Sequence, residues 1–333
     1  MLNRKISVIG SGAWGSALAD LLGNNGYEVV IYGINEDEVN EINTKHTNTK
    51  YFNNGFSIND NVRATLSFEE SVKDASIVLL AVPSFALVST INKLNNIIND
   101  NVIIVNVAKG FDKETSKTFS YVINNAITNK TVKLVSLLGP SFAEEVAEHQ
   151  LTAITASSDD LEAAKEVQEV FSSSYFRVYT ISDVIGAEYC AALKNVIALA
   201  SGILDGLGCK VNTRSALITR GIAEVSRYVL HFGGLEKTCL GLAGIGDLIL
   251  TCSSKTSRNY SAGYTIGSKG VEYFKANNTK TVEGVYACEI AHRISLENNI
   301  YSPIINAVYE VLFENKDPKE KIFELMNNEL KGE

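Results

Sequence analysis

The sequence predicts an α/β fold in its first half and an all-helical second half. Short runs rich in β-branched residues alternate with helical patterns up to about residue 182, as a sheet built from β-α-β units requires. After Ser182 the hydrophobic period is helical almost throughout. We therefore expect two domains, 1–182 and 183–333, in line with a prior of about 150 residues per domain.

The elements follow from local patterns taken in order. Short apolar runs bounded by turn residues predict strands at Lys5–Ile9, Glu28–Tyr32, Val62–Leu66, Ser76–Val82, Val102–Val107, Val132–Leu138, Thr152–Ala156 and Phe176–Thr180. Apolar residues at helical spacing predict helices between them at Trp14–Asn24, Ser67–Asp74, Ser84–Ile97, Ser116–Asn125 and Asp159–Phe171. In the second half the same spacing predicts a loop-rich middle and helices at Val184–Gly206, Ser215–Phe232, Val285–Asn298, Ile304–Glu314 and Pro318–Leu330.

A glycine-rich turn follows the first predicted strand. The segment Gly10-Ser-Gly12-Ala-Trp-Gly15 has the G-x-G-x-x-G spacing and leads into a helix. Gly10 permits a tight turn, Gly12 lets a pyrophosphate approach the backbone, and Gly15 lets helix pack on strand. The helix N-terminus adds free N–H donors for phosphates. The context predicts a Rossmann-type nucleotide-binding domain; the alternative is a turn that serves packing only.

Composition excludes several other classes of protein. The formal net charge is -8, whereas binding of nucleic acid or an anionic membrane rests on clustered Lys and Arg. The five cysteines are scattered, without the spacing of a disulfide framework or a zinc site, so we expect no metal. No stretch in the first half is long and apolar enough to span a bilayer. We expect a cytoplasmic protein with no nucleic-acid partner and no membrane segment.

In sheets of this kind ligands bind at the carboxyl ends of the strands. Three turns follow predicted strands there: Ala81-Val-Pro83-Ser, Lys109-Gly110 and Gly139-Pro-Ser141. Lys109 is a candidate site residue because it follows a predicted strand. The alternative is a solvated lysine in a loop, which would have the same sequence pattern.

Two charged residues stand in apolar surroundings in the second half. Lys194 is the one charge between Glu188 and Asp205 on a long apolar helix. Desolvation lowers the pKa of a lysine toward the range in which it can act as a general acid or base. The alternative is a lysine that snorkels to the surface. Asp247 is a lone carboxylate that needs a cationic partner, for which Lys194 is a candidate, or else an N-cap after Gly246.

The run Ser257-Arg258-Asn259 combines a hydroxyl, a guanidinium and an amide. These groups are typical of phosphate binding, because the guanidinium fork matches a phosphate and the others supply further donors. A polar solvated loop would have the same composition.

Taken together, these residues resemble the bacterial-type NAD(P)-dependent glycerol-3-phosphate dehydrogenases. The resemblance runs in order through nearly the whole chain: Gly10 to Gly15, Ala81-Val-Pro-Ser84, Lys109-Gly110, Gly139 to Glu145, Lys194-Asn195-Val-Ile, Thr213 to Gly221, Gly244-Ile-Gly-Asp247-Leu, Ser257-Arg258-Asn259 and Val282-Glu283-Gly284. Many ordered matches are far more specific than any single one.

The resemblance implies a role for each matching residue. Lys194 is implied to be the proton acceptor, with Lys109 and Asp247 completing the catalytic set. The substrate contacts are implied to be Lys109, Gly139, Ser141, Lys194, Asp247, Ser257, Arg258 and Asn259. The cofactor contacts are implied to be Gly10, Gly12, Ala13, Trp14, Gly15, Lys109, Ala143, Arg258 and Glu283. The implied reaction interconverts sn-glycerol 3-phosphate and dihydroxyacetone phosphate and supplies the former for phospholipid synthesis, and the resemblance leans toward a homodimer.

The cofactor choice is where the sequence departs from the family pattern. Many members have Trp-Gly followed by Arg or His after the second strand, whereas this chain has Tyr32-Gly33-Ile34-Asn35. The cation that would pair with the 2′-phosphate of NADP is therefore missing, and two acidic residues follow closely. We expect NAD(H) to be used at least comparably with NADP(H), unless Arg4, Lys5, Lys45 or Lys50 folds back to supply the charge.

Two other functions are weighed. A β-hydroxyacid dehydrogenase also has a catalytic lysine on a helix, but its Lys-x-x-x-Asn pattern is replaced here by Asn195 directly after Lys194, with Ala198 at the fourth position. A non-catalytic NAD(H)-sensing protein would have no use for a lone lysine in an apolar helix together with a Ser-Arg-Asn loop.

Overall fold

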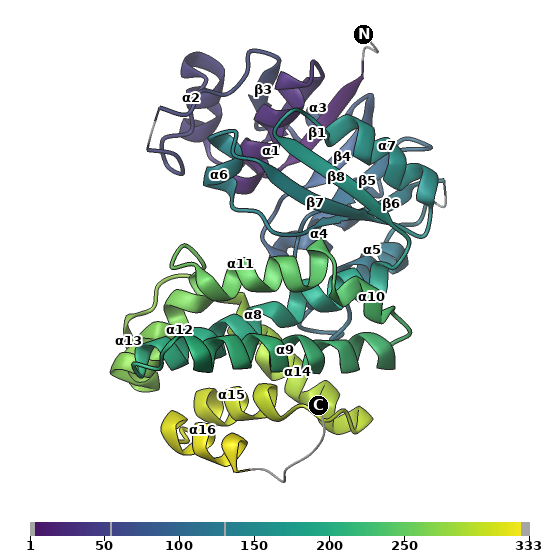
Figure 1. Cartoon of the computed structure of the whole chain (residues 1–333). Helices are drawn as coiled ribbons and strands as arrows, with labels where there is room; N and C mark the ends of the chain where they lie inside the picture. The colour runs from purple at the N-terminus through teal and green to yellow at the C-terminus, as the bar shows by residue number, and fades with distance from the viewer. Residues whose placement is uncertain (1–3, 54, 130, 328–333) are drawn as a thin grey trace. The chain divides into compact units, whose positions relative to one another are not determined.

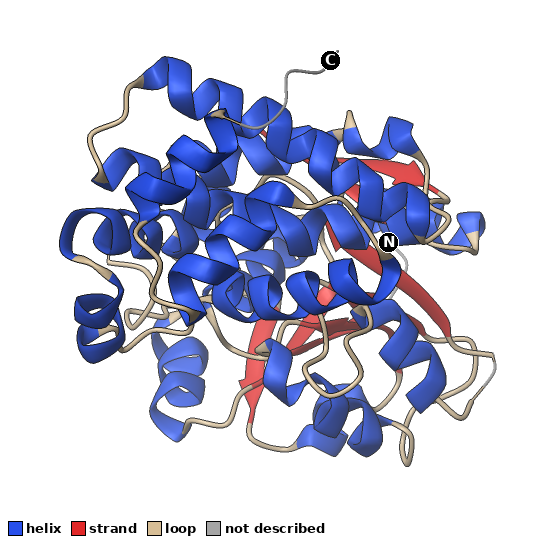
Figure 2. Ribbon diagram, turned by 90° about the horizontal axis from the view of Figure 1, so that it is seen from below, coloured by secondary structure: helices blue, strands red, loops and turns tan. Residues whose placement is uncertain are grey.

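The computed structural model describes residues 4–53, 55–129 and 131–327, which divide into two compact units. The first unit extends to Val184 apart from the segment Lys113–Ser116, and the second comprises that segment and the residues from Ile185 onward. Among the described residues, all strands belong to the first unit, whereas the second is built from helices (Figures 1 and 2). The predicted fold class, an α/β domain followed by an all-helical domain, is confirmed.

The first unit contains one sheet in the order β3-β2-β1-β4-β5-β6-β7-β8. Its strands are β1 (Lys5–Ile9), β2 (Glu28–Tyr32), β3 (Val62–Thr65), β4 (Ala75–Leu80), β5 (Ile103–Asn106), β6 (Lys133–Leu138), β7 (Thr152–Ser157) and β8 (Phe176–Ile181). The order reverses between β1 and β4, which is the point where ligands bind in doubly wound sheets. All eight predicted strands are present, with ends shifted by a few residues.

Helices bury both faces of the sheet. They are α1 (Ala13–Asn24), α2 (Glu36–Lys45), α3 (Phe68–Val72), α4 (Leu87–Leu94), α5 (Phe119–Ala126), α6 (Ala143–Ala147) and α7 (Leu161–Phe171). Successive strand residues point to opposite faces, so Leu79 joins the apolar cluster with α1 and α7, and Leu80 joins the cluster with α4 and α5. A sheet buried on both faces needs strands that are apolar along their whole length, and such strands can be predicted from the sequence.

The sheet is parallel, as β-α-β units require, except at one pair of strands. β6 and β7 run antiparallel, with Leu138 opposite Thr155. Parallel strands need a crossover of a dozen or more residues, normally through a full helix. The connection after β6 contains only the five-residue helix α6, so the chain turns back beside the same strand.

Two helices of the first unit were not predicted. α2 has a low apolar content and is held by its ends: the Asn35 side chain caps the N–H of Glu38, and acidic residues occupy the first turn. α6 is a single short turn. The predicted helix Ser84–Ile97 begins as a 3-10 turn at Ser84–Ala86 and continues as α4.

The second unit contains α8 (Val184–Gly206), α9 (Val211–His231), α10 (Glu236–Cys239), α11 (Asp247–Ser253), α12 (Arg258–Lys269), α13 (Val271–Asn277), α14 (Glu283–Asn298), α15 (Pro303–Phe313) and α16 (Pro318–Met326). The predicted loop-rich middle is wrong, because α10 to α13 occupy it. α10, α11 and α13 are only four to seven residues long, and helices of this length are not stable until they pack. α12 contains two glycines and two serines, which have a low helix propensity. The predicted end of the last helix, Leu330, lies outside the described residues.

The long helix α8 is the centre of the second unit. It is apolar and long enough to cross a membrane, but 89% of its most apolar window is buried inside the chain, as expected for a core helix. Backbone contact with α12 is made possible by glycines: a Cβ on Gly202 would lie 2.0 Å from the Tyr260 carbonyl oxygen, and one on Gly263 would lie 2.1 Å from that of Leu199.

We predict that Gly263→Ala destabilises the protein. The added methyl group would meet backbone that cannot move aside cheaply, so the free energy of unfolding should fall by about 1–3 kcal/mol. Ser268→Ala, on the exposed side of the same helix, is the control and should change it by less than about 0.5 kcal/mol. Urea denaturation followed by circular dichroism measures both; equal effects would contradict the assigned backbone contact.

Candidate active site

The glycine-rich turn has the shape that a dinucleotide requires. Gly10 has a φ of 117°, and a Cβ there would lie 2.6 Å from the Ala81 carbonyl oxygen. A Cβ on Gly15 would lie 2.1 Å from the Gly10 carbonyl oxygen, so helix and turn touch through backbone alone. A Cβ on Gly12 would meet nothing within 4 Å, which leaves space over the turn.

The start of α1 fits an anionic ligand. The helix begins at Ala13, no side chain caps its N-terminus, and its first turn contains no acidic residue. Its free N–H groups and the helix dipole therefore face the space over Gly12. Ala13 and Trp14 are half-buried, and both pack against the core of the first unit. The glycine-rich turn and the first turn of α1 thus offer the space and the N–H donors that the pyrophosphate of NAD or NADP requires.

The structure brings together three predicted substrate residues of the first unit. Lys109 follows β5, and its Nζ donates a hydrogen bond of 3.0 Å to the carbonyl oxygen of Gly139, which follows β6. The Ser141 hydroxyl lies 3.4 Å from the same oxygen. Gly139 has a φ of 150°, and a Cβ there would lie 3.0 Å from the Ile154 side chain. Because β5 and β6 are parallel neighbours, their carboxyl ends lie side by side.

The second unit holds a buried ion pair. Lys194, on α8, donates from Nζ to the Asp247 carboxylate at 2.5 Å and to the Thr251 hydroxyl at 3.0 Å. The three residues are almost fully buried. Thr251 in turn donates to the Asp247 carbonyl oxygen at 2.6 Å. The predicted partnership of Lys194 and Asp247 is confirmed, and the alternative of a snorkelling lysine is wrong.

An irregular turn places the carboxylate. The backbone departs from helical geometry at Gly244, within Leu242–Gly246, and α11 then begins with Asp247. Gly246 occupies the cap position, so the N-cap alternative for Asp247 is also wrong. A Cβ on Gly244 would lie 2.2 Å from the Cys239 carbonyl oxygen, so only glycine fits the turn.

Burial raises the pKa of the neighbouring Cys252 thiol to about 12, which keeps that thiol neutral.

A chain of amides connects α8, α12 and α14. Asn259 donates from Nδ2 to Asn195 Oδ1 at 2.9 Å and accepts the N–H of Gly284 at 2.8 Å. Gly284 directly follows Glu283, the first residue of α14. The Asn195 Nδ2 group is buried and has no hydrogen-bond partner among the residues that the structure describes. A buried donor of this kind is costly unless a ligand accepts its hydrogen bond.

Ser257 and Arg258 occupy different environments. The Ser257 hydroxyl caps α12 by accepting the N–H of Tyr260 at 3.2 Å, so this side chain has a structural role. Arg258 is the first residue of α12, exposed, and forms no ion pair with any described residue. Its guanidinium can therefore turn toward an anion without breaking a contact.

Two site residues were missed by sequence reasoning. Thr251 stands one helical turn after Asp247, the i, i+4 spacing that places both on one face of α11, and this spacing was the available signal. Asn195 was noted only because it differs from another family's pattern. Its burial beside Lys194 could not be read from an apolar helix that is buried on all sides.

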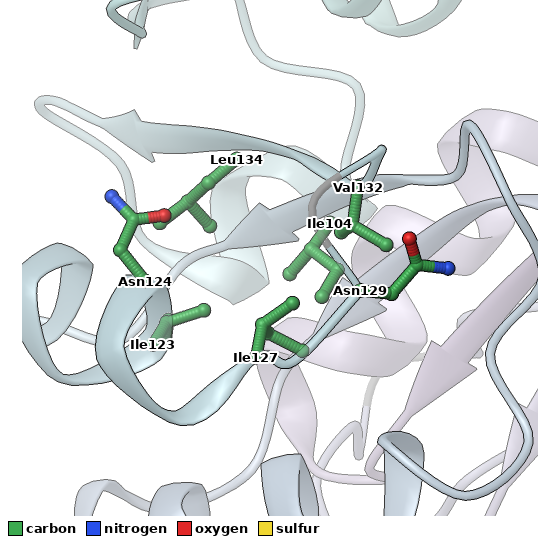
Figure 3. Close-up of a pocket in the computed structure, with 7 residues that line it drawn as sticks. All are labelled: Ile104, Ile123, Asn124, Ile127, Asn129, Val132 and Leu134. Carbon is green, nitrogen blue, oxygen red and sulfur yellow. The ribbon is translucent and has the colours of Figure 1, made fainter.

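One pocket lies elsewhere in the first unit (Figure 3). It is lined by α5 and the strands β5 and β6, with Ile104, Ile123 and Leu134 among its apolar side chains. It contains none of the predicted site residues. Among the described residues, no cluster of His, Cys, Asp and Glu could hold a metal ion.

A doubly wound sheet with this glycine turn, followed by a helical unit with a buried lysine, defines a nicotinamide-dinucleotide-dependent dehydrogenase. The model of the NAD-dependent glycerol-3-phosphate dehydrogenase N-terminus matches residues 5–164, and that of the C-terminus matches residues 183–323. The chain belongs to the family of NAD-dependent glycerol-3-phosphate dehydrogenases.

Individual relatives agree with this assignment. The enzyme named glycerol-3-phosphate dehydrogenase [NAD(P)+] from Limosilactobacillus reuteri (strain DSM 20016) is 42% identical to this chain, over 99% of this chain and 98% of the relative. The enzyme of the same name from Clostridium botulinum (strain Alaska E43 / Type E3) is 44% identical to this chain, over 99% of both chains. The crystal structure of glycerol-3-phosphate dehydrogenase from Coxiella burnetii superposes with a TM-score of 0.90 at 32% identity, covering 98% of this chain and 99% of that one. The protein is thus an oxidoreductase that uses NAD or NADP, and the two alternative functions are set aside.

We predict that the buried charges stabilise the second unit only as a pair. Asp247→Leu leaves an unpaired ammonium in the core and should lower the free energy of unfolding by about 3–5 kcal/mol. The double variant Lys194→Met, Asp247→Leu removes both charges and should recover most of that loss. Denaturant titration of the three proteins measures this, and a double variant no more stable than the single would contradict the pairing.

Proposed function

We propose that the protein interconverts sn-glycerol 3-phosphate and dihydroxyacetone phosphate, with Lys194 as the group that exchanges a proton with the substrate oxygen. The observation that carries the proposal is the buried contact of Lys194 with Asp247 and Thr251, in a chain of this family. NADH or NADPH, when bound, supplies the hydride that goes to C2 of the ketone.

Lys194 completes the reduction by donating a proton from its ammonium to the ketone oxygen, which becomes the hydroxyl of glycerol 3-phosphate. In the oxidation Lys194 accepts that proton as the hydride leaves C2. Asp247 stabilises the ammonium, and the Thr251 hydroxyl fixes its direction through a second hydrogen bond. Because both partners lie on α11, they hold Nζ in a single orientation. A proton donor that is already oriented lowers the barrier to proton transfer.

Phosphate binding is assigned to the start of α12 and its neighbours. Arg258 supplies an exposed guanidinium, and the unpartnered Nδ2 of Asn195 supplies a buried donor that Asn259 holds in place. We assign Ser257 and Asn259 to this site as residues that shape it as well as contact the substrate. Binding energy at the phosphate then orients C2 for the reaction.

The remaining roles follow from the resemblance. Lys109, Gly139 and Ser141 contact the substrate, and Lys109 adds positive charge that favours the developing oxyanion. Residues 1–182 bind the dinucleotide through the glycine-rich turn, Ala143 and Lys109, and residues 183–333 bind the substrate and add Arg258 and Glu283 to the cofactor contacts. We further propose that the enzyme acts in the cytoplasm as a homodimer and supplies glycerol 3-phosphate for phospholipid synthesis.

Lys194→Met should reduce kcat by about 10²–10⁴, the usual contribution of a positioned general acid, and leave cofactor binding nearly unchanged. Lys275→Met removes an exposed lysine of α13 and should leave kcat within about twofold of the wild type. Steady-state kinetics with dihydroxyacetone phosphate and NADH, together with NADH titration, measure this. A folded Lys194→Met enzyme that loses less than tenfold would exclude the proposed role.

Arg258→Ala tests the phosphate site. It should raise KM for dihydroxyacetone phosphate and lower kcat together, because binding energy at the remote phosphate is used for orientation. Unphosphorylated dihydroxyacetone should lose much less. Lys269→Ala, at the other end of α12, is the control. Equal losses with both substrates would place the phosphate elsewhere.

A further inference from the structure

The end of β2 is the region of the first unit that meets the adenosine ribose of a dinucleotide. Here Ile34 is 87% exposed, and the Asn35 side chain is occupied by capping α2. Glu36 and Asp37 follow in the first turn, both exposed. The segment thus offers a 2′-phosphate two carboxylates and no cation of its own.

Three of the four cations that could fold back to this region are held elsewhere. Arg4 pairs with Glu166 of α7. Lys5 is the first residue of β1, at the opposite end of the strand from the glycine-rich turn, and its Nζ donates to two backbone carbonyl oxygens there. Lys45 lies in the last turn of α2, about 14 Å along the helix from its first residue at 1.5 Å per residue.

The fourth cation, Lys50, is connected to the glycine-rich turn. Its Nζ donates at 2.5 Å to Oε1 of Glu38, a residue in the first turn of α2 that is 6% exposed. The other carboxylate oxygen, Oε2, accepts the Ser11 hydroxyl at 2.8 Å, and Ser11 lies between Gly10 and Gly12. The bond to Glu38 raises the pKa of Lys50, so the ammonium stays charged.

The loop that carries Lys50 is locked to the same turn. Asn48 is fully buried, and its Nδ2 donates to the Ser11 carbonyl oxygen at 2.9 Å and to the Ser16 hydroxyl at 3.0 Å. Lys50 follows two residues later, with its side chain more than half exposed. The cation is therefore held close to the ribose end of the cofactor site, but its charge is balanced by Glu38.

We propose that the Glu38–Lys50 ion pair determines the choice between NAD(H) and NADP(H): Glu38 neutralises Lys50, which is otherwise placed to receive the 2′-phosphate. In the wild type the pair has no net charge, so Glu36 and Asp37 dominate the local field and NADP gains nothing from its extra phosphate. Removing the Glu38 charge frees Lys50 for the phosphate. The inference rests on the cofactor site proposed above.

The test measures binding without substrate. Isothermal titration calorimetry with NAD⁺ and NADP⁺ should show wild-type protein binding NAD⁺ at least as tightly as NADP⁺. Glu38→Gln keeps an acceptor for Ser11 and should tighten NADP⁺ binding about tenfold, the effect of one new hydrogen bond between charged groups, with NAD⁺ changed less than about twofold. The double variant Glu38→Gln, Lys50→Gln should return to wild-type discrimination. Glu38→Gln, Lys45→Gln is the matched control and should keep the gain.

A second variant, Lys50→Gln, tests the proposal even if Glu38→Gln does not fold. Lys50→Gln changes a side chain on an exposed loop and leaves Glu38 uncompensated, so NADP⁺ should bind several-fold more weakly and NAD⁺ should be unaffected. The proposal is overturned by an unchanged NADP⁺ affinity in Glu38→Gln or in Lys50→Gln, by a gain that survives loss of Lys50, or by equal changes for both cofactors. Wild-type protein that binds neither cofactor would instead refute the cofactor site itself.

Discussion

The second unit is organised around an ion pair that is almost fully buried. Removing an ammonium and a carboxylate from water is expensive unless they are paired and hydrogen-bonded, and Lys194 and Asp247 meet both conditions with the help of Thr251. Burial of this pair constrains the neighbouring helices. α8 must be covered on all sides, and α11 must begin at a point from which its first residue, Asp247, reaches Lys194. The same burial that makes the pair costly gives the lysine a fixed position and a low-dielectric surrounding, which proton exchange at a substrate oxygen needs.

Close backbone contact is the second constraint on the structure. Gly10, Gly15, Gly202 and Gly263 each stand where a Cβ would overlap a carbonyl group. In the first unit this contact shapes the glycine-rich turn, and in the second it brings α12 against α8. The buried Asn195 and Asn259 then meet across those two helices, so packing by glycine also positions polar groups.

Cofactor selectivity shows how a charge can be present and yet unavailable. Lys50 lies near the glycine-rich turn, but its partner Glu38 is bonded to that turn as well. Counting cations along the sequence would assign Lys50 to the 2′-phosphate. Only the pairing shows that the ammonium is neutralised by a buried carboxylate.

The sequence alone determined the fold class, the sheet strands and the glycine-rich turn, because these follow from local periodicity and from backbone conformations that few residues can adopt. It also determined that Lys194 and Asp247 need partners, since a charge in an apolar segment is a physical anomaly wherever it lies. Only the tertiary structure decided that they pair with each other and with Thr251. It also decided that β7 runs antiparallel to β6, that the segment between α9 and α14 forms the short helices α10 to α13, and that Glu38 balances Lys50. These outcomes depend on contacts between residues distant in the chain, whose energies exceed the weak local preferences that a sequence displays.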